Sequence, residues 1–169
     1  MDAIECIQTR RSIRRYKRNA VSGAVLKQLL ESAMCAPSAG NEQPWHFIVL
    51  KDPEVLKRIA SFHPFATMAS SAPVAILVCG DPRLEKHKGF WVQDCAAATQ
   101  TLLLAAHALG LGGVWVGVHP REERVKGFRA LLKIPDHVVP FALVPLGVPD
   151  EKTGKVERLR EDRIHEETW

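Results

Sequence analysis

The chain has 169 residues, of which 46% are hydrophobic and 25% charged; these ordinary globular values exclude a disordered or low-complexity chain. Its 23 Lys and Arg residues outnumber 19 Asp and Glu residues, which gives a net charge of +4. This length predicts a single domain, residues 1–169, with a substantial core.

Taken in chain order, the sequence predicts alternating helices and strands. Asp2 and Glu5 have the spacing of a capping box that opens a short helix through residue 9, and Ser22 caps a second helix. The remaining predicted elements are a strand at 47–50, a helix from Pro53, a strand at 74–78, a helix at about 89–109, a strand at 114–118, a helix at about 121–132 and a strand at 141–146. Pro145 predicts an edge or a bulge in the last strand. This order indicates a single α/β or α+β domain.

The basic residues are concentrated in one segment, residues 10–18, which holds six of the 23 cations. Without these six charges the rest of the chain is net acidic, so the basicity is local. Arg11, Ser12 and Arg14 offer guanidinium groups and a hydroxyl, which suit the oxygens of a phosphate. A solvated basic connector is the alternative interpretation of this segment.

Three further features are candidates for a binding site. Asn41 and Gln43 are carboxamides in a loop, and paired amides match the edge of a heteroaromatic ring, although loop amides often close turns. Glycines at 112, 113 and 117 allow the backbone to approach a flat ligand, or permit a bend in a core strand. Arg158 lies in a charged tail with no core pattern, where arginines are usually solvated.

Other classes of protein are not favoured by the sequence. The stretch 95–118 has no charged residue, but its glycines divide it into a core helix and a strand, so we expect no membrane span. Four distant cysteines and a start without signal-peptide features predict reduced thiols in the cytoplasm. We find no metal-ligand spacing and no catalytic triad, so we expect a cofactor to carry the chemistry.

Together these segments resemble the FMN-dependent nitroreductase family. The resemblance covers nearly the whole chain and rests on residues 4–14, 36–38, 41–45, 110–115, 134–137, 144–149, 157–159 and 164–165. It implies an α+β fold with three layers (α/β/α), in which helices flank a central, mostly antiparallel sheet. It also implies an intimate, domain-swapped-style homodimer with two FMN sites at the interface.

The resemblance further implies roles for particular residues. The expected cofactor-binding residues are Arg10, Arg11, Ser12, Arg14, Pro37, Ser38, Asn41, Gln43, Trp115, Val116, Gly117 and Arg158. The first four and Arg158 would hold the phosphate and ribityl chain, and the loop residues would come from the partner chain. Trp115 to Gly117 would lie along the flavin ring, with a backbone N–H directed at its N5 atom. No side chain is expected to be catalytic, because the flavin carries the hydride.

The implied activity is a two-step, ping-pong reaction. NADH or NADPH would reduce FMN at N5, and an electron-poor acceptor such as a nitroaromatic, quinone or enone would then be reduced. A reductive dehalogenase or a flavin-consuming enzyme is the alternative within the flavin class. The chain is short between Ile59 and Pro73, where larger family members have extra residues; Phe62, His63, Phe65 and Trp91 are our candidates for covering the flavin.

A nucleic-acid-binding module is the competing hypothesis from another class. Tyr16 would stack on a base while the basic segment contacts phosphates. Because the charge is so local and only one aromatic residue accompanies it, we expect no nucleic-acid partner.

Overall fold

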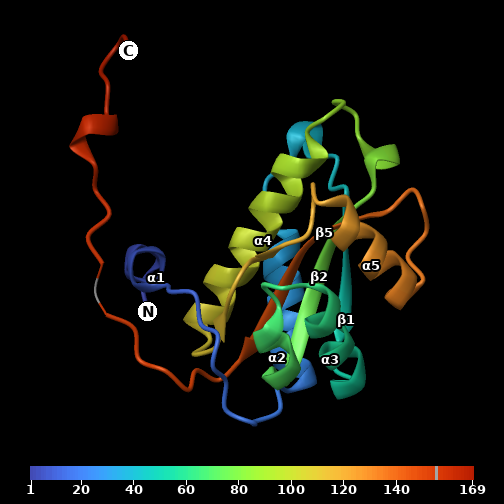
Figure 1. The fold of residues 1–169 in the computed structure, drawn as a ribbon. Coiled ribbons are helices and arrows are strands. Elements are labelled where there is room, and N and C mark those ends of the chain that lie inside the picture. Colours follow the sequence, from blue (N-terminus) through green and yellow to red (C-terminus); the bar gives the residue numbers. More distant parts are fainter. Residues whose placement is uncertain (155) are drawn as a thin grey trace.

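A five-stranded sheet forms the centre of the computed structural model, which describes residues 1–154 and 156–169 (Figure 1). The strands are β1 (Trp45–Leu50), β2 (Val74–Gly80), β3 (Gly112–Gly113), β4 (Val116–Gly117) and β5 (Val139–Gly147). β2 lies between β1 and β5, while β3 and β4 both pair with β5. All of these pairs are antiparallel, as predicted.

Helices cover both faces of the sheet. α2 (Gly23–Met34) and α4 (Trp91–Ala108) pack on one face, α3 (Pro53–Phe62) and α5 (Glu122–Leu132) on the other, and α1 (Ala3–Thr9) lies against α4. β2 is buried along its whole length and sends alternate side chains, such as Ile76 and Leu77, into the two cores. The predicted α+β fold with three layers is therefore confirmed.

Side-chain caps explain where three helices begin. The Asp2 carboxylate accepts hydrogen bonds from the N–H groups of Ile4 and Glu5, and the Ser22 hydroxyl accepts one from Val25. Asp52 caps α3 directly before Pro53, whose missing N–H costs nothing at this position. The predicted starts of these helices are confirmed, whereas the long helix begins at Trp91, two residues later than expected.

The single strand predicted at 114–118 is wrong in detail. The structure has two short strands, β3 and β4, separated by Val114 and Trp115. Pro145 does not mark a sheet edge either, because β5 has partners on both sides. β3 pairs with residues 146–147 and β4 with 142–143, so Pro145 lies opposite the break between them, where its missing N–H interrupts no ladder.

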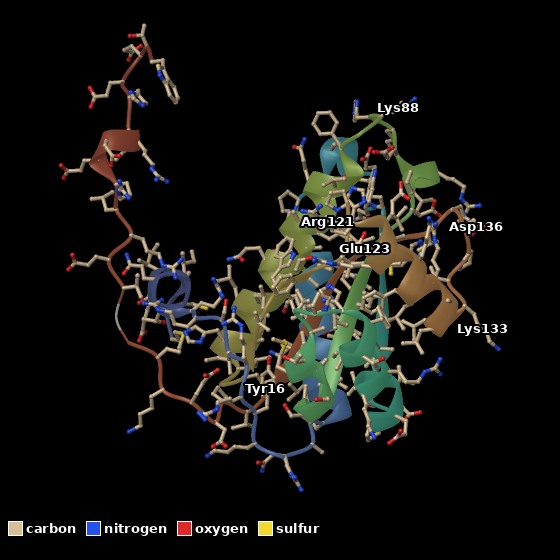
Figure 2. All side chains as sticks on the ribbon, viewed as in Figure 1. Tyr16, Lys88, Arg121, Glu123, Lys133 and Asp136 are labelled. Carbon is tan, nitrogen blue, oxygen red and sulfur yellow. The ribbon has the colours of Figure 1, made fainter. Side chains whose placement is uncertain are left out.

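The basic segment runs along the sheet and the tail leaves it. Ser12 forms a bridge with Gly113, and Tyr16, which is labelled in Figure 2, forms one with Pro149. Residues 152–154 and 156–169 pass α1 and extend away from the body of the fold, with exposed side chains (Figures 1 and 2). Cys6, Cys79 and Cys95 are buried free thiols, but Cys35 is exposed. Among the described residues, no helix combines the length and apolar character needed to cross a membrane.

Candidate functional site

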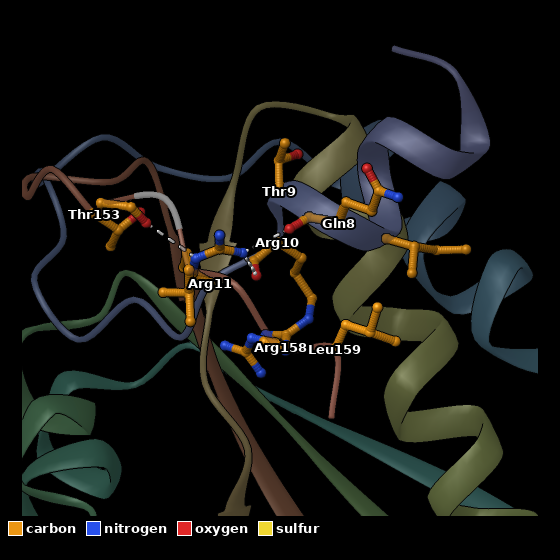
Figure 3. Close-up of a pocket in the computed structure, with 10 residues that line it drawn as sticks. Gln8, Thr9, Arg10, Arg11, Thr153, Arg158 and Leu159 are labelled. Atoms are coloured by element: carbon orange, nitrogen blue, oxygen red, sulfur yellow. Dashed lines mark hydrogen bonds between the residues drawn. The ribbon is translucent and has the colours of Figure 1, made fainter. Parts of the chain in front are cut away.

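Three arginines that are distant in sequence line one cavity. Arg10 and Arg11, directly after α1, face Arg158 from the tail across a space of about 640 Å³ (Figure 3). We call this space the arginine cavity; it is also lined by Ile7, Gln8, Thr9, Thr153, Gly154, Val156 and Leu159. The structure thus brings Arg158 together with Arg10 and Arg11, while their role in binding a cofactor stays a prediction.

The arginine cavity is an electrostatically unfavourable arrangement on its own. Burial, then Arg158, then Arg11, lowers the pKa of Arg10. Cations this close destabilise one another, and a phosphate would relieve the repulsion while accepting their hydrogen bonds. His107 of α4 lies nearby, with its Nε2 atom 2.8 Å from the Thr9 hydroxyl oxygen. Nothing in the sequence had indicated His107 or Thr9.

Arg11 differs from the other two arginines because three of its five N–H donors already bond to backbone carbonyls. Its Nη1 atom donates to the carbonyls of Gln8 and Arg10, both at 2.8 Å, and its Nε atom donates to Gly154 at 3.3 Å. Arg11 therefore ties the end of α1 to the tail and shapes the cavity. Arg10 and Arg158 are the better candidates for direct contact with an anion.

A second cavity of about 400 Å³ lies beside β4, and we call it the ring cavity. Its walls are formed by Arg14, Pro64, Phe65, Thr67, Met68, Val114, Trp115, Val116, Gly117 and Arg124. Arg14 is held in place through its backbone, because Glu151 accepts hydrogen bonds from the N–H groups of Arg14 and Arg15. Ser12 lies between the two cavities in sequence and in space, since it forms the bridge to Gly113.

The glycines of this region have different roles. A Cβ atom at Gly112 would lie 2.6 Å from Ile13, and one at Gly113 would lie 2.7 Å from Leu146, so both glycines permit packing within the chain. A Cβ at Gly117 would meet no atom within 4 Å. Only Gly117 therefore presents bare backbone to open space, which suits close approach by a flat ligand.

The amide-bearing loop lies elsewhere in the chain. Asp94, near the start of α4, accepts the Ala39 N–H at 3.0 Å, whereas α1 contacts α4 near Leu104. With a rise of 1.5 Å per residue, these points are about 15 Å apart along α4. Among the described residues that line the two cavities, none comes from this loop, so Pro37, Ser38, Asn41 and Gln43 are not brought together with the arginines within one chain.

Hydrogen bonds within the loop and to residues 86–87 fix its conformation. The Ser38 hydroxyl accepts the Gln43 N–H at 3.1 Å, and both Asn41 and Gln43 have positive φ angles, 54° and 47°. Between them, Glu42 turns inward and accepts the backbone N–H groups of Lys86 and His87 at 2.7 and 3.0 Å. This alternation leaves the two amides on the outer side of the loop.

Of the four candidates for covering the flavin, only one fits. Phe65 is 66% exposed and lines the ring cavity. Phe62 packs instead on Gly127 and Phe128, and His63 is fully buried. Trp91 packs against Gly80 and His119 in the other core layer. Those three expectations are corrected: the short segment after Ile59 sends most of its aromatic rings into the core.

The fold is that of an α+β protein with two neighbouring cavities, one lined by arginines and one bordered by the bare backbone of Gly117. Comparison with known proteins identifies the family. The model of the Nitroreductase family matches residues 7–63 and 63–148, and the chain belongs to this family. The family expected from the sequence is thereby confirmed.

Individual relatives agree with this assignment. A protein of Methanothermobacter thermautotrophicus, provisionally named NADH dehydrogenase/NAD(P)H nitroreductase, is 53% identical over 100% of this chain and 88% of its own. The FMN reductase [NAD(P)H] of Bacillus subtilis is 29% identical over 99% of this chain and 74% of its own. A provisionally named nitroreductase from Desulfovibrio desulfuricans, solved in complex with FMN, is 31% identical, with a TM-score of 0.85 over 100% of this chain and 99% of its own.

Proposed function

We propose that this protein is an FMN-dependent NAD(P)H oxidoreductase that reduces an electron-poor acceptor, such as a nitroaromatic, quinone or enone, by a ping-pong mechanism. Family membership and the names of the relatives, which include NAD(P)H nitroreductase and FMN reductase, support the enzyme class and the cofactor. The acceptor and the order of steps are the finer parts of the proposal.

The observation that carries this proposal is the pairing of the two cavities. The arginine cavity is lined by three cations, and the pKa of one of them, Arg10, is lowered. The ring cavity is bordered by the bare backbone of Gly117. Residues 10–14 connect them, and an extended chain covers about 10 Å over three residues. A cofactor with a phosphate at one end and a flat ring at the other matches both spaces, so the residues present fit FMN.

Each part of the chain then has a physical task. Arg10 and Arg158 hold the phosphate, Arg11 fixes the cavity, and Ser12 offers a hydroxyl to the phosphate or ribityl chain. Arg14, which was expected at the phosphate and ribityl chain, lines the ring cavity instead, where its cation would stabilise negative charge on a reduced ring. The backbone of Trp115, Val116 and Gly117 orients the ring without a side-chain acid. FMN, when bound, supplies the hydride acceptor and donor.

The proposal includes a homodimer, in which Pro37, Ser38, Asn41 and Gln43 of one chain complete the site of the other. The separation of this loop from the two cavities within one chain supports it, as does the apolar surface of α4. We also infer that residues 1–169 form one FMN-binding domain, since both core layers share β2. Three buried free thiols support a reducing, cytoplasmic location.

The competing hypotheses gain little from the structure. Tyr16 is 7% exposed, and its hydroxyl donates to the carbonyls of Ile13 and Pro145, so Tyr16 is not available to stack on a base. A reductive dehalogenase or a flavin-consuming enzyme would use the same two cavities. These activities differ from the proposed one in the acceptor.

Reconstitution and steady-state kinetics test the proposal. The purified protein is expected to bind one FMN per chain and to elute as a dimer, and initial rates with NAD(P)H and a quinone should give parallel double-reciprocal lines. Intersecting lines would contradict the ping-pong order. Failure of the protein to take up FMN at all would reject the enzyme class.

A further inference from the structure

Two side chains at the ring cavity each contact the same two walls of that cavity. His63, directly after α3, and Arg124, in the first turn of α5, both reach Gly117 and Phe65. We propose that His63 and Arg124 are positioning residues that hold the Gly117 wall and the Phe65 wall of the ring cavity at a fixed separation. The inference rests on the proposed function, because this separation matters where a flat ring lies between the walls.

The histidine bridge requires one tautomer. His63 Nε2 lies 3.0 Å from the Gly117 carbonyl oxygen, which accepts only, so Nε2 carries the hydrogen. His63 Nδ1 is then free to accept the Phe65 N–H at 3.3 Å. One neutral imidazole thus joins the two walls by two hydrogen bonds.

The surroundings of His63 keep it neutral. The side chain is fully buried, and burial lowers its pKa, while its hydrogen bond to Gly117 acts in the opposite direction. Arg124 and Glu123 of α5 are the charged groups that face it; Arg124 lowers the pKa and Glu123 raises it. A protonated ring would present an N–H to the Phe65 N–H, so the bridge exists only in the neutral form.

The arginine bridge runs parallel to the first. Arg124 Nη1 donates to the same Gly117 carbonyl at 2.8 Å, and the centre of the guanidinium lies 5.3 Å from the centroid of the Phe65 ring. Its side chain is 17% exposed, so the hydrogen bond is largely shielded from water. A cation over an aromatic face is attractive at this distance.

β4 is held by its pairing with β5 and by the buried side chains of Val116 and Val118, but neither Gly117 nor Phe65 is anchored through a buried side chain of its own. β4 has two residues, and Gly117 has no side chain with which to anchor itself. Phe65 is 66% exposed, so little of its ring is fixed by the core. The bridges instead fix the Gly117 carbonyl and the Phe65 backbone and ring, at opposite sides of the same space.

A purely structural role for these residues makes a different prediction. His63 also packs edge-on against Phe128, as does Phe62, which contacts neither wall through a hydrogen bond. If His63 and Arg124 only stabilised the core, their loss would resemble the loss of Phe62. If they position the walls, their loss will change the cavity itself.

The test compares Arg124→Met with Arg124→Lys, His63→Leu and two controls, Lys126→Met on the exposed side of α5 and Phe62→Leu in the core. Hydrogen exchange in the FMN-free chain is expected to rise in both segments 63–67 and 114–119 for Arg124→Met and His63→Leu. FMN affinity, measured by fluorescence quenching, is expected to fall on the order of tenfold in both variants, because the loosened walls of the ring cavity must be ordered when FMN binds. Arg124→Lys should recover part of both effects, and the controls should leave FMN affinity unchanged.

The outcomes separate this inference from the proposed function. Suppose that the wild type binds FMN and that Arg124→Met changes neither hydrogen exchange nor FMN affinity. This result overturns the positioning role of Arg124 and leaves the proposed function in place. Increased exchange in only one of the two segments also overturns this positioning role, because loss of a bridge loosens both ends. A wild-type protein that binds no FMN rejects the proposed function and this inference with it. Arg124 is not part of the hydrophobic core, so its variant decides the matter even where His63→Leu fails to fold.

Discussion

Glu42 and Asp94 are neighbouring buried carboxyl groups, and the inner oxygen of each, Oε1 of Glu42 and Oδ2 of Asp94, has no other hydrogen-bond partner among the described residues, so a proton shared between the two carboxyl groups ties the amide-bearing loop to α4. Burial alone raises the pKa of Glu42, but the N–H groups of His87 and Lys86 outweigh it and lower this pKa. Burial, together with the bond to Glu42, raises the pKa of Asp94. Asp94 therefore keeps the shared proton and Glu42 carries the charge.

This pair predicts a pH dependence of stability. The pKa of Asp94 is raised in the folded state, so protonated Asp94 stabilises the fold. This contribution to the free energy of unfolding is complete below the usual carboxyl range, and it is lost as pH rises through the raised pKa. Thermal unfolding followed from the usual carboxyl range upward in pH should show the stability of the wild type falling through this effect. Asp94→Asn retains an acceptor for Ala39 and a donor for Glu42, so it should remove the decline. If the stability of Asp94→Asn declines with pH as that of the wild type does, another group causes the decline. Glu122→Gln, which changes an exposed carboxylate, is the control and should retain the decline.

Asp94→Ala should be much more harmful than Asp94→Asn. It leaves the Ala39 N–H and the inner oxygen of Glu42 without a partner, at a cost of about 1–3 kcal/mol. Chemical denaturation measures this difference directly. Equal stabilities of the two variants would contradict the shared-proton pair.

The arginine cavity predicts a difference among its three cations. Arg10→Ala and Arg158→Ala should each weaken FMN binding by roughly tenfold to a hundredfold, since each removes a charge-assisted contact to the phosphate. Arg11→Ala should also lower the melting temperature without FMN, because Arg11 bonds the carbonyls of Gln8, Arg10 and Gly154. Titration of FMN and melting curves separate the two effects. Unchanged affinity in Arg10→Ala and Arg158→Ala would mean that the phosphate binds elsewhere.

Two glycines of the same region should respond in opposite ways. Gly117→Ala adds a methyl group in open space, so it should leave stability unchanged and weaken FMN binding by roughly tenfold or more. Gly112→Ala places the methyl group against Ile13 and should cost about 1–3 kcal/mol of stability. Denaturation and FMN titration of both variants check this contrast. Normal FMN affinity in Gly117→Ala would remove Gly117 from the ring site.

The parts of the site that follow a local pattern could be predicted from the sequence. The run of arginines and the glycine-rich strand are visible as unusual local composition, and Asp2, Ser22 and Pro53 mark helix starts. Family resemblance then related these separate segments to one cofactor.

The remaining features depend on contacts between distant segments. Asp94 reads as a charge at the start of an apolar helix, and only the fold brings it to Glu42. His63 and Arg124 meet at Gly117 because α3, β4 and α5 converge, which no spacing in the sequence reveals. Pro145 was misread for a similar reason, since the break between β3 and β4 is set by the pairing of the whole sheet.

The central claim is that this chain passes electrons from NAD(P)H to an acceptor through bound FMN. The most direct measurement is an anaerobic titration of the FMN-loaded protein with NADH and with NADPH, followed by addition of a quinone or nitroaromatic. The account predicts bleaching of the flavin absorbance by at least one nicotinamide and its full return on addition of the acceptor. A flavin absorbance that neither nicotinamide bleaches would contradict the account.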